Sequence, residues 1–344
     1  MIRIGVIGYG YWGPNLVRNF SEVSGCRIAA VCDARADRQA AVSRRYPSVR
    51  VTGDYRTILA DPSIDAVAIA TPVDTHFALA LEALCAGKHV WVEKPMTSTS
   101  DEAARLIDEA GRRRLLLHVD HTFLYTGAVR KIQELIAADD VGRVYYYDSI
   151  RVNLGLFQRD VNVIWDLAVH DISIMDCVMP LRPCAISATG TSHVPGAPEN
   201  IAYLTMFFDG STIGHVHVSW LAPVKVRRTL IGGSRKMIVY DDLETIEKVR
   251  VYDKGLRLGE SSDARYQMLV GYRTGDMWSP HLDVTEALQT EASHFVDCID
   301  HRRASQSDGQ AGLRVVRILE AASQSMAGRG RIVALDLPSE RATA

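Results

Sequence analysis

MIRIGVIGYGYWG, residues 1–13, is the stretch that decides the fold of the first part of the chain. The apolar run Ile4–Ile7 predicts a buried strand, and Gly8, Gly10 and Gly13 follow it at once. In this spacing the first glycine permits a tight turn, the second lets a pyrophosphate approach bare backbone, and the third lets a helix pack closely on the strand. Pro14 suits the first turn of that helix, where no N–H group is needed. The stretch therefore predicts the strand, turn and helix start of a dinucleotide-binding unit.

The turn and the next strand together predict the cofactor. N–H groups at the helix start would hold the phosphates, and Tyr11 and Trp12 lie in the same turn as further predicted contacts. The run Ile28–Asp33 predicts the following strand and ends in an acid twenty positions after the last glycine, where a carboxylate binds the adenosine ribose. Such an acid repels the 2′-phosphate of NADP, although the neighbouring Arg35 and Arg38 soften that repulsion. We predict NAD as the cofactor and keep NADP as the alternative.

The composition is that of an ordinary soluble protein with room for two domains. The 344 residues are 47% hydrophobic and 23% charged, and the formal net charge is −2. This charge offers no basic field for nucleic acid, and no apolar run approaches the roughly 20 residues that span a bilayer. The six cysteines form no Cys-x-x-Cys pair, and His215 and His217 have no further metal-ligating side chain nearby, so we predict no metal site. Without a basic leader or cleavage pattern, a cytoplasmic location is the default expectation.

Alternating strand and helix patterns predict an α/β fold for the first part of the chain. Residues 1–122 are expected to form an NAD(P)-binding Rossmann domain, with a parallel sheet and helices on both faces. The predicted strands are 2–7, 28–32, 66–70, 89–92 and 115–119, and the predicted helices are 14–20, 38–46, 55–59, 76–86 and 100–112.

The pattern changes in residues 123–344, which are predicted to form a second domain. Closely spaced strands predict a large antiparallel sheet, while residues 254–280 carry few periodic signals and are predicted to be irregular. The last helix and strand are candidates to pack back on the first domain. The predicted helices are 129–136, 165–178, 285–300 and 310–326, and the predicted strands are 143–152, 185–189, 202–208, 212–220, 228–231, 236–240, 249–252 and 331–335.

Two groups of polar residues follow predicted parallel strands. Thr71, Pro72 and His76 come after the third strand, and Glu93 and Lys94 come after the fourth. Because α/β sheets bind ligands at the carboxyl ends of their strands, all five are predicted to contact the cofactor. From the residues alone, a capping or packing role for His76 and a solvated loop lysine at position 94 remain open.

Together with a later motif, these segments resemble a known family. The glycine turn, Thr71-Pro72, Glu93-Lys94-Pro95 and Asp166-x-x-x-His170 stand in the order and spacing of the glucose–fructose oxidoreductase, inositol dehydrogenase and rhizopine-catabolism (Gfo/Idh/MocA) family. The resemblance covers nearly the whole chain. It implies a Rossmann domain followed by an α+β domain, built on an open, mostly antiparallel sheet, for substrate binding and oligomerisation. It also implies hydride transfer between a ring hydroxyl of a sugar or cyclitol and a nicotinamide cofactor.

The resemblance makes Lys94, Asp166 and His170 the catalytic group and substrate contacts. His170 can accept the hydroxyl proton because imidazole titrates near neutral pH. Asp166 lies one helical turn away on the same face and can orient the imidazole or bind a substrate hydroxyl. Lys94 would stabilise the developing alkoxide. Taken alone, Asp166 and His170 would be read as an ordinary pair on a helix surface.

Residues 151–162 precede this pair and are predicted to select the substrate. The segment is polar and partly basic, and Asn153, Arg159 and Asn162 are the predicted substrate contacts. Arg151 and Arg159 could bind a phosphate because guanidinium groups match its oxygens; a solvated loop is the alternative. The segment resembles that of family members which oxidise the C3 hydroxyl of nucleotide sugars.

Three hypotheses follow. The first is an NAD-dependent dehydrogenase of a nucleotide-activated amino sugar, and the second is an inositol or free-sugar dehydrogenase. The third is a regulatory protein that binds NAD without catalysis. Family analogy also predicts a homodimer or homotetramer, with no nucleic-acid or membrane partner.

Overall fold

The computed structural model describes residues 1–155, 161–258 and 270–337. The chain divides into two compact units. The first unit comprises Met1–Thr126 and Thr285–Arg317, and the second comprises Gly127–Val284 and the described chain from Ile318 onward. A segment distant in sequence thus belongs to the first unit.

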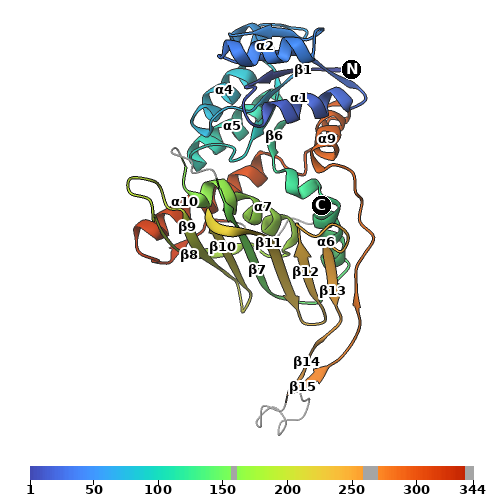
Figure 1. The fold of residues 1–344 in the computed structure, drawn as a ribbon, viewed down its shortest axis with the longest axis vertical. Coiled ribbons are helices and arrows are strands. Elements are labelled where there is room, and N and C mark those ends of the chain that lie inside the picture. The colour runs from blue at the N-terminus through green and yellow to red at the C-terminus, as the bar shows by residue number, and fades with distance from the viewer. Residues whose placement is uncertain (156–160, 259–269, 338–344) are drawn as a thin grey trace. The chain divides into compact units, whose positions relative to one another are not determined.

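A parallel sheet forms the centre of the first unit (Figure 1). Within the described chain it has six strands in the order β3-β2-β1-β4-β5-β6, and each neighbouring pair is parallel. This confirms the fold class predicted for this part of the chain. The sequence pattern missed β3, because three partly exposed residues are too few to show a period. The strands are β1 (Ile2–Ile7), β2 (Cys26–Cys32), β3 (Arg50–Thr52), β4 (Ala66–Ile69), β5 (His89–Glu93) and β6 (Leu117–Asp120).

Aromatic side chains tie the helices of the first unit to its sheet. Trp91 of β5 is fully buried and meets Phe20 and Phe295 edge to face, at centroid distances of 5.2 and 5.5 Å. Phe20 lies on α1 and Phe295 on α9, so a helix near the C-terminus completes this core. The helices of the unit are α1 (Gly13–Glu22), α2 (Ala36–Arg45), α3 (Arg56–Leu59), α4 (Val73–Cys85), α5 (Ser100–Arg113), η1 (Thr122–Tyr125), α9 (Ala287–His301) and the first part of α10 (Gly309–Ala327).

A mixed sheet forms the centre of the second unit. Its order is β16-β13-β12-β11-β7-β10-β9-β8-β17; β7 and β10 pair in parallel, and the other described neighbours are antiparallel. The mostly antiparallel sheet is therefore confirmed. The strands are β7 (Val144–Leu154), β8 (Pro183–Thr191), β9 (Ile201–Phe208), β10 (Ile213–Ser219), β11 (Leu221–Gly233), β12 (Met237–Asp241), β13 (Val249–Tyr252), β16 (Met277–Trp278) and β17 (Val333–Ala334).

One face of this sheet is buried and the other is open. On β9, Ala202, Leu204 and Met206 are buried and alternate with Tyr203 and Thr205, which are exposed or half-buried. Figure 1 shows the helices of the unit gathered on one side of the strands. They are α6 (Gly127–Ala137), the π-helical turn η2 (Ile164–Ala168), α7 (Val169–Val178) and the second part of α10.

The prediction of an irregular segment at 254–280 was wrong in the part that the structure describes. Gly255–Leu258 (β14) and Val270–Arg273 (β15) pair with each other, and β16 joins the large sheet beside β13. These strands have four residues or two, so their periodicity is too short to detect. Residues 259–269 lie outside the described chain. None of the described helices is long and apolar enough to cross a membrane.

Candidate active site

The glycine-rich turn between β1 and α1 has no space for a side chain at Gly8 or Gly13. Gly8 has a φ of +97°, and a Cβ atom there would lie 2.4 Å from the carbonyl oxygen of Ala70. A Cβ atom on Gly13 would lie 2.2 Å from the carbonyl oxygen of Gly8, and α1 begins at Gly13. Close backbone approach and the free N–H groups of a helix start fit the pyrophosphate of a dinucleotide.

Asp33 stands at the end of β2, where it connects to this turn. The backbone N–H of Tyr9 donates to its Oδ2 over 2.7 Å, and that of Arg35 donates to its Oδ1 over 2.9 Å. The guanidinium of Arg38 lies 3.3 Å from Asp33 Oδ2 and beside Gly10, whose Cβ position would be 3.2 Å from Arg38 Nη1. Arg35 instead pairs with Asp37. Arg35 thus contacts Asp33 through its backbone only, whereas the guanidinium of Arg38 lies between the acid and the glycine turn.

His76 connects two strand ends. Its Nδ1 and Nε2 lie 2.9 Å from the carbonyl oxygens of Pro95 and Thr71, respectively, and the ring is 1% exposed. Burial lowers the pKa of His76, so the neutral ring donates its single proton to one carbonyl. His76 therefore holds the Thr71-Pro72 turn and the Lys94-Pro95 turn together. Its contact with the cofactor stays a prediction.

Lys94 follows β5 directly and is half-buried. Its backbone N–H donates to Glu93 Oε2 over 3.2 Å, and the Lys94–Pro95 peptide bond is cis. Glu93 Oε1 is closed off from solvent. The carboxyl group predicted to contact the cofactor is thus directed into the unit and braces the turn that carries Lys94.

Sequence reasoning missed Asp120, the last residue of β6. It is buried, and it accepts hydrogen bonds from Trp12 Nε1 over 2.8 Å and from Thr122 Oγ1 over 2.5 Å. The indole N–H of Trp12, a predicted cofactor contact, is therefore used inside the unit, whereas Tyr11 beside it is 88% exposed. The strand-end rule that singled out Lys94 could also have singled out Asp120.

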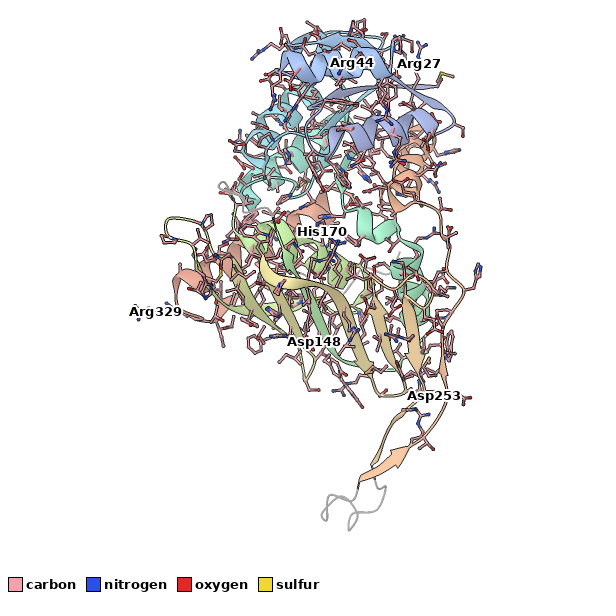
Figure 2. All side chains as sticks on the ribbon, viewed as in Figure 1. Arg27, Arg44, Asp148, His170, Asp253 and Arg329 are labelled. Carbon is pink, nitrogen blue, oxygen red and sulfur yellow. The ribbon has the colours of Figure 1, made fainter. Side chains whose placement is uncertain are left out.

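Asp166 and His170 lie where two kinds of helix meet. Asp166 belongs to the π-helical turn η2. His170, which Figure 2 labels, belongs to α7. Trp220 Nε1 donates to Asp166 Oδ2 over 2.9 Å, which fixes that carboxylate. The helix predicted around 165–178 is present, but it starts as a π-helical turn, and this wider turn changes how the two side chains are offset. Such π turns are frequent at functional sites.

The two predicted substrate contacts that the structure describes before this turn have different positions. Asn162 Oδ1 accepts from the backbone N–H groups of Ile164 and Trp165 at 3.2 and 3.3 Å, so this predicted substrate contact starts the π turn. Asn153 is half-buried near the end of β7. Arg159 lies outside the described residues.

Arg151 as a candidate phosphate ligand is contradicted by the structure. It is 2% exposed, and its Nε and Nη2 lie 2.6 and 3.3 Å from the two carboxylate oxygens of Asp171. Ser149 Oγ also donates to Asp171, over 2.7 Å. A buried charge needs such a partner, and here the pair anchors α7, which carries His170, to β7.

Comparisons with known proteins agree with this architecture. Residues 2–121 match the oxidoreductase family with an NAD-binding Rossmann fold, and residues 129–239 match the GFO/IDH/MocA C-terminal domain. UDP-N-acetylglucosamine 3-dehydrogenase from Acidithiobacillus ferrooxidans is 28% identical over 323 residues, covering 92% of this chain and 94% of the relative. A solved structure of that enzyme has a TM-score of 0.78 at 27% identity, covering 95% of this chain and 97% of the other.

A second relative has a different named substrate. Inositol 2-dehydrogenase 2 from Saccharopolyspora erythraea is 31% identical over 198 residues, covering 56% of this chain and 57% of the relative. Both domain matches occur in the expected order, on a Rossmann unit followed by a unit with a mostly antiparallel sheet. The chain belongs to the Gfo/Idh/MocA family of NAD(P)-dependent oxidoreductases.

Proposed function

We propose that this protein is an NAD-dependent dehydrogenase that oxidises the C3 hydroxyl of a nucleotide-activated amino sugar, in amino-sugar or polysaccharide biosynthesis. The observation that carries the substrate class is the similarity, over 92% of the chain, to a UDP-N-acetylglucosamine 3-dehydrogenase. The reaction type is supported by the side chains themselves. Lys94 follows a parallel strand beside the dinucleotide turn, and Asp166 and His170 lie at one helix junction.

Three side chains divide the catalytic work in this proposal. NAD, when bound, would supply the hydride acceptor for the carbinol carbon. His170 accepts the proton of the same hydroxyl, and the ammonium of Lys94 stabilises the alkoxide as it forms. Asp166 is held by Trp220 and orients the imidazole or a substrate hydroxyl. The Arg151–Asp171 pair keeps α7, and with it His170, in place.

An inositol dehydrogenase is the second candidate, because a relative with that name matches more than half of the chain. A screen separates the candidates: purified protein and NAD are mixed with nucleotide amino sugars, inositols and free hexoses, and nicotinamide absorbance is followed. We expect reduction of NAD with the nucleotide amino sugars. Turnover with inositols alone would remove our first proposal, and NAD binding without turnover of any substrate would favour a regulatory protein.

We also propose NAD over NADP, from the contacts of Asp33. Its carboxylate faces the glycine turn through the Tyr9 N–H group, and the guanidinium of Arg38 lies 3.3 Å from its Oδ2. The 2′-phosphate of NADP would lie against this negative carboxylate and be repelled by it. The carboxylate has little room to move away, because Asp33 is 7% exposed.

The variant Asp33→Asn tests the cofactor choice. The amide keeps an oxygen for the Tyr9 N–H group but loses the charge, and Arg38 becomes available to a phosphate. We expect the ratio of NADP to NAD dissociation constants to fall about tenfold or more, since hydrogen bonds to charged groups contribute about 1.5–3 kcal/mol. Asp37→Asn, at an exposed acid paired with Arg35, should leave the ratio unchanged. An unchanged ratio in Asp33→Asn would mean that another residue selects NAD.

A homodimer or homotetramer is proposed from the open sheet face. Tyr145, Tyr203 and Ile213 are 45%, 44% and 45% exposed. Asp148, which Figure 2 labels, pairs with His215 on the same strands. Aromatic side chains are enriched at protein interfaces. Light scattering should give the mass of two or four chains; a monomer at micromolar concentration would exclude this assembly.

A further inference from the structure

Three carboxyl groups meet in the interior of the first unit. Glu93 and Asp120 are the last residues of β5 and β6, and the parallel register of these strands places them side by side. Glu291, on α9, is fully buried and faces the same Asp120. Like charges on adjacent strands destabilise a sheet, so the ionisation of this cluster requires an explanation.

The hydrogen bonds show where protons must be. Each glutamate has one oxygen that accepts from a neighbour: Glu93 Oε2 from the Lys94 N–H group, and Glu291 Oε1 from His118 Nε2 at 3.0 Å. The other oxygens, Glu93 Oε1 and Glu291 Oε2, are buried and meet no donor among the described residues. Both glutamates nevertheless lie within hydrogen-bonding reach of Asp120. Two carboxyl groups can share a hydrogen bond only if one of them carries a proton.

Asp120 is the group that accepts. Trp12 Nε1 and Thr122 Oγ1 donate to its two oxygens, and a carboxylate has about four acceptor positions. Protons on Glu93 Oε1 and Glu291 Oε2 would fill the remaining two. With two protons and one negative charge, every buried oxygen of the cluster is satisfied.

His118 does not supply a balancing charge. Its Nδ1 lies 2.8 Å from Ser305 Oγ, which accepts from the Ser307 N–H group and so has its own proton free to donate. A neutral ring then accepts at Nδ1 and donates from Nε2 to Glu291. Full burial and the nearby His294 and His121 lower the pKa of His118 well below its usual value.

Burial acts in the opposite direction on the glutamates. Desolvation first, and then the charge of Asp120, raise the pKa of Glu93 and of Glu291 well above the usual range. The ammonium of Lys94 opposes the shift at Glu93 and is outweighed. The charged or titratable groups that face the cluster are thus Lys94 after β5, His118 and His121 at β6, and His294 on α9.

We propose that Glu93, Asp120 and Glu291 form a proton-sharing cluster in which both glutamates stay protonated at neutral pH and the Asp120 carboxylate links the glycine-rich turn to the Lys94 turn. Trp12 belongs to the first turn, and Glu93 braces the second. The three residues are positioning residues for the cofactor-binding end of the sheet, and the protons hold them together. Losing a proton places a second negative charge in the buried cluster and loosens both turns.

Infrared spectroscopy of the protein without cofactor tests the protonation directly. At neutral pH the wild-type protein should show carbonyl absorption of buried protonated carboxyl groups, and Glu291→Gln should remove part of it. Glu286→Gln, one residue before α9 and exposed, should leave the band intact, because Glu286 pairs with Arg18 and burial does not favour its neutral form. A wild-type spectrum without such a band would overturn the proposal.

Thermal unfolding gives a second readout. Glutamine mimics protonated glutamate, since its oxygen can accept from His118 and its NH₂ group can donate to Asp120. The folded chain with a raised pKa holds more protons than the unfolded chain, so the free energy of unfolding falls as pH rises from about 4.3 toward the raised value. In Glu291→Gln the contribution of residue 291 to this decrease in the free energy of unfolding is absent, because glutamine does not titrate. Its Tm relative to wild type should rise by roughly 2–4 °C per pH unit in this window.

Cofactor binding shows whether the cluster positions the turns. The dissociation constant for NAD should increase between neutral and alkaline pH, and the increase should be at least about tenfold larger in the wild type than in Glu291→Gln. A factor of ten is the effect of titrating one group over one pH unit. Equal pH profiles for both proteins would mean that the cluster is only structural. A large loss of Tm in Glu291→Gln at neutral pH would show instead an ionised Glu291 paired with a charged His118. None of these readouts depends on the sugar substrate, so their failure is distinguishable from failure of the proposed reaction.

Discussion

Replacing His170 with alanine is expected to lower kcat by about 10²–10⁴, the usual contribution of a general acid or base, while NAD still binds. Lys94→Met should lower kcat by a similar factor, because it removes the ammonium that stabilises the developing alkoxide. Both effects should appear in kcat and kcat/KM alike, since the interactions strengthen in the transition state. Stopped-flow and steady-state measurements with the best substrate of the screen give these values.

Two exposed residues of the second unit serve as matched controls for these changes. His281→Ala and Lys254→Met alter the same residue types away from the candidate site, and both should retain wild-type kcat. The pH profile adds a further check. The wild-type rate should fall at acidic pH, where the base is protonated, and His170→Ala should lose that limb. Full activity in both site variants would show that the catalytic assignment is wrong.

Gly13→Ala is expected to abolish measurable NAD binding. The added Cβ atom would sit 2.2 Å from the carbonyl oxygen of Gly8, and backbone on both sides leaves no side chain that could rotate away. Either α1 shifts from β1 or the turn opens, and both movements displace the N–H groups that hold the pyrophosphate. We expect at least a hundredfold rise in the dissociation constant, on the order of 3 kcal/mol, measured by calorimetry.

Gly111→Ala provides the control for a glycine-to-alanine change. Gly111 lies within α5, and nothing stands within 4 Å of its Cβ position. Alanine favours the helix by about 0.5–1 kcal/mol, so this variant should unfold at a slightly higher temperature and bind NAD normally. Wild-type NAD affinity in Gly13→Ala would contradict the assignment of this turn to the dinucleotide.

The sequence predicted the elements whose signals are local. The apolar run of β1, the glycine spacing and the acid at the end of β2 all lie within 33 consecutive residues, and each has its own steric or electrostatic reason. The strand-rich second unit could be recognised because most of its strands alternate buried and exposed residues. Some short strands, namely β3, β14 and β16, show no such period and were missed, although β4 and β13 are equally short and were predicted from their apolar residues.

Side-chain roles that depend on distant partners could not be predicted in this way. The sequence around Arg151 suggests a phosphate ligand, but in the structure its guanidinium is bound by Asp171, twenty positions later. Glu291 lies far from Asp120 in the sequence, and only the packing of α9 in the first unit brings them together. The π turn at Asp166 has no sequence period of its own, since its signal resembles that of an ordinary helix.

The most direct test of the proposed reaction uses a nucleotide amino sugar that carries deuterium at C3. Purified protein is incubated with this substrate and NAD, and the products are read by mass spectrometry and NMR. The proposal predicts that the deuterium moves to the nicotinamide ring and that a 3-keto sugar forms. Two results would contradict it. One is deuterium that remains at C3 while NAD is reduced. The other is no reduction of NAD by the nucleotide amino sugar while inositol is an active substrate.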